Sequence, residues 1–176
     1  MMMKKGDDVI INDYHNIPRP ELIELGNHVA IDAFFHCTTG LVVKDYVHIG
    51  PHVSIIGGKD VYCQIGNFSG MAAGCRIVCA SDEYLGEGLI NPIVPKEFRD
   101  NVISGPVILE DFVTLATNVV VLPGITLAQG TVVSVGSIVT KDTMPWTVYA
   151  GSPARPIRQR PKEKMLVYAK ELGYDS

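Results

Sequence analysis

The best candidates for managing a proton in this 176-residue chain fall in two places. His48 and His52 stand four residues apart in V-H-I-G-P-H-V, and an imidazole takes up or releases a proton near neutral pH. Asp82 stands beside Glu83 at the start of a long irregular segment, where a carboxylate can orient an amine or, when burial raises its pKa, accept a proton. Structural roles stay open for all three: a Ser-Asp turn for Asp82, and exposed or interface packing for the histidines.

Basic side chains, which can bind phosphate, lie close together near the end of the sequence. The chain is otherwise acidic, with a formal charge of −4 and a pI of about 5.7. This basic run either meets phosphates or forms a solvated surface, and consists of Arg155, Arg158, Arg160, Lys162 and Lys164. The acidic balance argues against nucleic-acid binding. No stretch of about 20 apolar residues predicts a membrane span, and the start MMMKKGDD lacks an apolar signal core. We expect a cytoplasmic protein.

The cysteines are predicted to be reduced, buried, small apolar side chains. Cys37, Cys63, Cys75 and Cys79 show no C-x-x-C spacing, and no histidines are arranged around them as a zinc site requires. The sequence therefore predicts no metal site.

Aliphatic residues recur every six positions, and this period predicts the elements that hold the candidate site residues. Val and Ile together number 38 against 11 Leu, which favours strands over helices. The period slips by four residues at 57–60 and is interrupted again at 83–106. Its first positions are Leu25, Ile31, Cys37, Val43, Ile49, Ile55, then Ile65, Met71, Ile77, then Leu109, Leu115, Val121, Leu127, Val133 and Val139.

A hexad of this kind describes one strand and the corner that follows it. Three hexads form a triangular coil, and coils stack at the strand spacing of about 4.8 Å with the first-position aliphatics inside. An ordinary β-sandwich would show a period of two, which this sequence does not keep. The pattern predicts an all-β parallel β-helix over 1–160, with His15 before the repeat begins and with His48 and His52 in outward or corner positions.

Two segments depart from the repeat. Residues 83–106 contain three Pro and three Gly and form a loop long enough to cover a site. Residues 161–173, PKEKMLVYAKELG, begin with Pro and end with Gly, as a short helix does. We expect residues 161–176 to form a helical cap on the open end of the stack.

Two stretches resemble the hexapeptide-repeat acyltransferases, and in particular the sugar O- and N-acetyltransferases. They are L-E-D-F-V-T-L-A-T-N-V-V-V-L-P-G-I-T-L from Leu109 and V-T-K-D-T-M-P-W-T-V-Y-A-G-S-P-A-R-P-I from Val139. The ending A-G-S-P-A-R-P-I resembles the family signature A-G-x-P-A-(K/R)-x-(I/V/L), and the likeness covers about residues 25–160. The resemblance implies a left-handed β-helix, a homotrimer with active sites between subunits, acetyl-CoA as donor, and a saccharide hydroxyl or amine as acceptor.

The resemblance also assigns roles to individual positions. A backbone N–H near Thr117 is expected to bind the oxyanion. The other positions are expected to lie along CoA or meet its phosphates: Thr140, Lys141, Gly151, Pro153, Arg155 and Arg158. Trp146 is compatible with a wall for the adenine or with simple packing.

The sequence departs from the family at the residue that would take the acceptor's proton. The sugar O-acetyltransferases carry a catalytic His five residues after the last aliphatic position before the long loop, and here that slot, counted from Ile77, holds Asp82. An amine attacks a thioester with less help than a hydroxyl needs, and the departing CoA thiolate can take the proton, so Asp82 favours amine acceptors. The hydroxyl reading requires His48 or His52 from a neighbouring subunit.

Two other functions stay open. A β-helix that kept the fold without the His could be a catalytically silent trimeric binding or scaffold protein. A carbonic-anhydrase-like metalloenzyme needs three converging histidines, and none follows His52. For the acetyltransferase we expect an acceptor saccharide that is linked to a nucleotide or bound in a polysaccharide, and no motif identifies the sugar.

Overall fold

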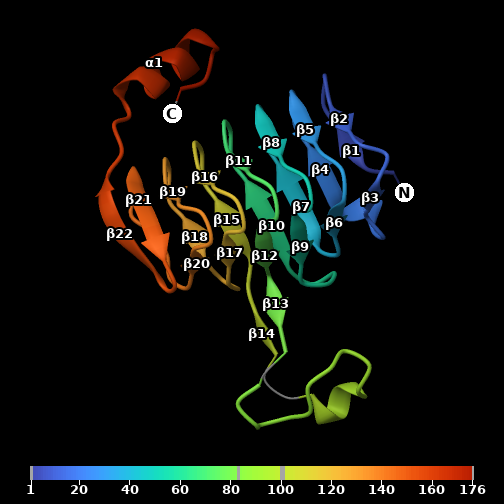
Figure 1. Cartoon of the computed structure of the whole chain (residues 1–176). Helices are drawn as coiled ribbons and strands as arrows, with labels where there is room; N and C mark the ends of the chain where they lie inside the picture. Colours follow the sequence, from blue (N-terminus) through green and yellow to red (C-terminus); the bar gives the residue numbers. More distant parts are fainter. Residues whose placement is uncertain (1, 83, 100–101, 176) are drawn as a thin grey trace.

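The structure is a computed structural model that describes residues 2–82, 84–99 and 102–175, and it confirms the β-helix (Figure 1). The first sheet has the strand order β1-β4-β7-β10-β15-β18. Its strands are parallel, and they are β1 (Lys4–Lys5), β4 (Ile23–Leu25), β7 (Gly40–Val43), β10 (Tyr62–Ile65), β15 (Val107–Leu109) and β18 (Thr126–Leu127).

The second sheet is parallel except for its last pair, in which β22 runs antiparallel to β21. In spatial order its strands are β2 (Ile10–Ile11), β5 (Val29–Ile31), β8 (Val47–Ile49), β11 (Gly70–Met71), β16 (Thr114–Leu115), β19 (Val132–Val133), β21 (Thr147–Gly151) and β22 (Ala154–Gln159).

The third sheet is again parallel and closes the triangle. Its strands are β3 (His15–Asn16), β6 (Phe35–Cys37), β9 (Ser54–Ile56), β12 (Arg76–Val78), β17 (Val120–Val121) and β20 (Ile138–Val139). Each coil turns from the first sheet to the second at the first corner, from the second to the third at the second corner, and back to the first at the third corner.

The interior is filled by the predicted first-position residues, because alternate side chains of a strand point to opposite faces. Leu25, Ile31 and Cys37 in one coil are at most 3% exposed, and Leu109, Leu115 and Val121 in a later coil are fully buried. Neighbouring coils stack these residues, as in the pairing of Ile31 with Ile49.

All four cysteines are free and buried in this core. Burial raises the pKa of the Cys37 and Cys79 thiols to about 11. The predicted reduced, buried role is therefore confirmed.

The stack begins earlier than the sequence indicated. The expectation that His15 precedes the repeat is wrong, because His15 lies in β3 and pairs with Phe35 of β6. Ile11 and Ile17 continue the six-residue period in this first coil and pack against the core. The period is hidden because the short 3-10 helix Pro20–Leu22 adds residues before the next coil, so that Ile11 pairs with Ile31, twenty residues later.

Both predicted interruptions lie at the third corner. The slip at 57–60 lengthens one coil, so that Cys63 pairs with Leu41, and it is confirmed. The long loop is an arm that leaves the stack through an antiparallel pair, β13 (Ala80–Ser81) with β14 (Ile103–Ser104), and carries the 3-10 helix Lys96–Phe98. Figure 1 shows this arm projecting away from the prism. Glu83 lies outside the described residues.

The C-terminal helix α1 (Glu163–Glu171) forms as predicted, but it packs beside the stack rather than across its end. Ala169 of α1 and the rings of Phe112 and Trp146 form a second buried cluster at the first corner. The helix lies there because Met165, Leu166 and Ala169 pack their apolar side chains against the rings of the first corner. No helix in the described residues is long and apolar enough to cross a membrane.

Candidate active site

A groove of about 440 Å³ runs across the outer face of the second sheet to the second corner. Its floor consists of small side chains because neighbouring coils approach closely there; a Cβ on Gly50 would lie 2.9 Å from the Met71 carbonyl oxygen. The lining is His48, Gly50, Pro51, Gly70, Met71, Ala72, Ala73, Thr114, Leu115 and Ala116. A thin, flexible chain such as an acyl thioester arm fits a channel of this kind.

His48 borders the groove and is held by a carboxylate. Its Nε2 lies 2.9 Å from Oδ2 of Asp32 on the preceding coil, with the two side chains 64% and 45% exposed. When Nε2–H donates to this carboxylate, Nδ1 is the nitrogen left to accept a proton. Sequence reasoning missed Asp32, although β5 pairs Ala30 with His48 and so places Asp32 two residues further along the adjacent strand.

His52 lies at the second corner and is packed differently. Its backbone has φ of 58°, and its ring stacks on Phe34 with centroids 4.6 Å apart. The His52 carbonyl accepts a hydrogen bond from the Arg76 guanidinium at 2.7 Å. His52 is therefore part of an exposed ring stack beside the groove.

Asp82 lies at the base of the arm, at the third corner. Its Oδ2 accepts a hydrogen bond from the backbone N–H of Asn91 at 3.2 Å, which ties the carboxylate to the arm. One chain thus keeps its three proton-managing candidates apart: His48 on the second sheet, His52 at the second corner and Asp82 at the third.

Part of the predicted CoA contact surface does converge. Thr117 and Gly151 lie at the second corner, linked through the last coils: the Gly136 N–H donates to the Thr117 carbonyl at 2.9 Å, and the Gly151 N–H donates to Oγ of Ser137 at 3.0 Å. The amides on either side of Thr117 donate within the stack, to Val133 and Ala73. Within the described residues, the Thr117 N–H itself has no acceptor.

The remaining CoA-side candidates lie at a distance from this convergence or on its outer edge. Thr140 and Lys141 follow β20 at the third corner. Pro153 is in the turn between β21 and β22, and Arg155 and Arg158 are exposed on β22, opposite Ala150 and Val148. Trp146 is only 7% exposed and packs on Phe112, which favours the packing role for this residue.

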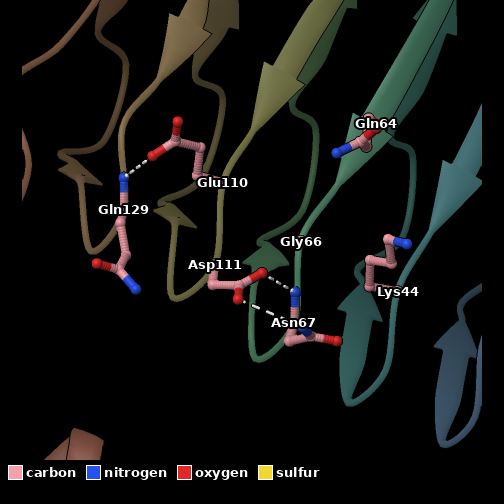
Figure 2. A pocket seen from close by; sticks show the side chains of 7 residues that line it. All are labelled: Lys44, Gln64, Gly66, Asn67, Glu110, Asp111 and Gln129. Carbon is pink, nitrogen blue, oxygen red and sulfur yellow. Dashed lines mark hydrogen bonds between the residues drawn. The ribbon is translucent and has the colours of Figure 1, made fainter. Parts of the chain in front are cut away.

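A second hollow, of about 520 Å³, lies between the first sheet and the first corner (Figure 2). Its carboxylates accept hydrogen bonds from backbone amides: Asp111 Oδ1 accepts from the Asn67 N–H at 2.6 Å, and Glu110 Oε2 accepts from the Gln129 N–H at 2.7 Å. These hydrogen bonds stabilise the corner, which favours a structural role for both carboxylates. No group of three side chains able to hold a metal occurs in the described part of the chain.

Comparison with known proteins identifies the family of this prism. No family model matches the chain. The dTDP-4-amino-4,6-dideoxy-D-glucose acyltransferase of Escherichia coli is 32% identical over 161 residues, 90% of this chain and 82% of that protein. The N-acyltransferase AntD of Bacillus cereus, solved with dTDP and 3-hydroxybutyryl-CoA, superposes with a TM-score of 0.92 at 26% identity, over 97% of this chain and 90% of AntD.

A hexapeptide-repeat acetyltransferase of Vibrio cholerae, solved with acetyl-CoA, shares the fold at a TM-score of 0.61 and 24% identity, over 78% of this chain and 70% of that one. The length of the Escherichia coli match, together with the prism and its C-terminal signature, leaves one assignment. This chain is an acyltransferase and belongs to the left-handed β-helix, hexapeptide-repeat family that contains the sugar N-acyltransferases.

Proposed function

We propose that the protein is a cytoplasmic, metal-independent homotrimer that transfers an acetyl group from acetyl-CoA to the amino group of a nucleotide-linked saccharide. The observation that carries the proposal is the groove on the second sheet, which ends at Ala116 beside the unbonded amide of Thr117. Such a channel accommodates a thioester, and the amide at its end is a donor for the oxyanion. The similarity to enzymes named for an amino sugar supports the acceptor.

In the proposed reaction the acceptor nitrogen attacks the thioester carbonyl carbon, and the carbonyl oxygen becomes an oxyanion held by the Thr117 N–H. Collapse of this intermediate breaks the C–S bond and expels the CoA thiolate, which takes the proton that the nitrogen loses. Asp82 orients the amine through its carboxylate. Gly151, Pro153, Arg155, Arg158, Thr140 and Lys141 contact CoA, the arginines at its phosphates.

The trimer is proposed because one chain does not bring its own parts together. Asp82 is at the third corner, whereas the groove and the His48–Asp32 pair are on the second sheet. The arm that carries Asp82 extends away from its own prism and exposes large apolar side chains, among them Leu89, Ile93 and Phe98. A neighbouring prism is the surface that these side chains fit, and the second sheet of that neighbour then completes the site. Sedimentation equilibrium tests the mass, with three chains expected.

The decisive test measures thiol release from acetyl-CoA with amino and hydroxyl sugars, free and nucleotide-linked. We expect turnover of the nucleotide-linked amino sugars. Asp82→Ala is expected to lower kcat/KM about 100-fold, since a positioned acid or base contributes about 10²- to 10⁴-fold. Asp82→Asn, which keeps the shape and one acceptor, is the matched variant.

Each other outcome assigns a different role. Turnover of hydroxyl sugars that is lost in His48→Asn would establish the O-acetyl reaction with His48 as base, and His52→Asn tests the second histidine in the same way. Absence of turnover with every acceptor would contradict the proposal and favour the silent scaffold.

A further inference from the structure

Three stacked rings stand uncovered along the second corner. Tyr14 and Phe34 stack with centroids 6.1 Å apart, and Phe34 and His52 stack with centroids 4.6 Å apart and planes 15° from parallel. Tyr14 is 72% and Phe34 56% exposed. We call these residues the bare column.

The backbone fixes the orientation of these rings. Phe34 and His52 have φ of 63° and 58°, in the left-handed region that glycine usually occupies. The Phe34 N–H donates to the Tyr14 carbonyl at 2.5 Å and the His52 N–H to the Ala33 carbonyl at 3.0 Å, so that each ring is held above the last. The column ends at Gly74 on the next coil, where no ring continues it.

Phe34 lies between Tyr14 and His52, so a π face that stays free for a planar heteroaromatic base is the outer face of the exposed His52 ring, on the side of Gly74. Base–aromatic stacking tolerates different bases because every base has a π face. The bare column also adjoins the candidate active site, because Pro51, the neighbour of His52, lines the groove. A ligand with its base on the rings can therefore extend across the second corner into the groove.

We propose that the bare column binds the base of the nucleotide-linked acceptor. The inference rests on the proposed function and deepens it, since it says where the chain recognises the nucleotide. The acceptor is favoured over the adenine of CoA because the column lies on the first coils, whereas the converging CoA-side positions, Thr117 and Gly151, lie on the last ones.

Binding of dTDP, measured by calorimetry on the full chain, tests the proposal without requiring turnover. His52→Gly removes the ring with the free face and fits the left-handed backbone, so it preserves the corner. We expect it to weaken dTDP binding about 5- to 100-fold, the range that loss of one stacked aromatic produces. Phe34→Tyr should bind like the native protein, and so should Tyr62→Ala, which removes an exposed ring from the first sheet.

The ring of His52 supplies a second readout. In NMR spectra, addition of dTDP should shift the His52 ring protons upfield, whereas inorganic pyrophosphate, which has no base, should not. Native-like dTDP affinity in His52→Gly, with no shift of the His52 ring protons in the native protein, would overturn the proposal. Loss of CoA binding in place of dTDP binding would assign the column to adenine and overturn it equally.

The two proposals fail separately. Native turnover of nucleotide-linked amino sugars in His52→Gly, with dTDP affinity unchanged, removes the bare column and keeps the enzyme function. Binding of dTDP that depends on His52 in a protein that turns over no acceptor keeps the column and removes the function.

Discussion

The first and second corners both carry a column of stacked rings, but the C-terminal segment covers the first column and the second is exposed. At the first corner five rings stack through the height of the prism, with neighbouring centroids 4.5 to 5.6 Å apart. We call this the covered column, because the C-terminal segment packs on it: Tyr174 meets Tyr46 and Phe68 edge-on. Its members all have positive φ and are His28, Tyr46, Phe68, Phe112 and Trp146.

The two columns differ in what offsets the free-energy cost of their positive φ angles. A residue other than glycine in the left-handed region costs about 1–2 kcal/mol. In the covered column, burial of rings such as Phe112, only 5% exposed, offsets that cost. In the bare column the rings are exposed and little burial offsets it. Strain that burial does not offset points to a functional role.

The largest expected effect compares the central rings of the two columns. Phe112→Gly should lower the free energy of unfolding by about 3 kcal/mol, because it removes a buried ring while relieving the backbone. Phe34→Gly should change it by less than about 1 kcal/mol, since the lost stacking and the relieved backbone nearly cancel. Urea denaturation at fixed protein concentration measures both. Equal losses would show that the bare column is also structural.

A smaller difference in stability is expected at two glycines, each of which occupies the corner position that carries a ring on other coils. A Cβ on Gly130 would overlap the indole of Trp146, which fills the place of a ring on that coil. Gly130→Ala should therefore cost about 2–3 kcal/mol, from strain together with overpacking. At Gly74 the atom in the way is Oδ1 of Asn118, an exposed side chain that can rotate. Gly74→Ala should cost only about 1 kcal/mol.

The fluorescence of Trp146 distinguishes these two variants further. It is the only tryptophan of the chain and lies in the covered column. Its emission should shift to the red in Gly130→Ala and stay unchanged in Gly74→Ala. A shift in both would mean that the two columns are coupled through the prism.

The smallest expected effect concerns the bond that ties the C-terminal segment to the covered column. The Tyr174 hydroxyl donates to Oδ2 of Asp45 at 2.6 Å. Tyr174→Phe should cost about 0.5–1 kcal/mol, the lower part of the range for a hydrogen bond because the pair is exposed to solvent.

The cost of Tyr174→Phe should depend on pH. The carboxylate of Asp45 raises the pKa of Tyr174 from 10.0 to about 12, so this contribution is complete below pH 10 and is lost as the pH rises through 12. The pKa of Asp45 is lowered from 3.8 although its partial burial opposes this, because hydrogen bonds from Tyr174 and Asn27 favour the charged form. That contribution is present above pH 3.8 and is lost as the pH falls through the lowered value. Melting curves of the native protein and of Tyr174→Phe across this pH range measure the difference in their stability. A difference that does not change with pH would contradict the assigned hydrogen bond.

The hexads were enough to predict the prism, because each first-position residue, such as Leu115, has one way to be buried. They did not predict the ring columns, since Phe34 and Phe112 occupy the fourth place of a hexad, which the period leaves unspecified. The first coil was missed because the inserted residues around Pro20 shift its register. The pairing of Asp32 with His48 was missed for a related reason: it depends on a neighbouring coil and not on local spacing.

The candidate site was the least predictable part. Motifs located Gly151 and Thr117, which meet at one corner, but they gave no distance between Asp82 and the histidines. In the proposed trimer that distance depends on where the arm of one chain reaches on its neighbour, and the hexad period does not extend to the arm.

The C-terminal end of the prism has a bearing on end-to-end association of such stacks. A stack of parallel strands exposes a row of backbone groups on its last coil, which invites another prism to add end to end as a fibre. Here Asp142 accepts the Thr126 N–H at 2.8 Å and Thr143 accepts the Ala128 N–H at 2.9 Å, so β18 offers fewer donors. On the second sheet, β22 turns back antiparallel and carries Pro156, which has no N–H to donate. The last coil therefore offers fewer backbone donors to a second prism, which disfavours end-to-end addition at this end.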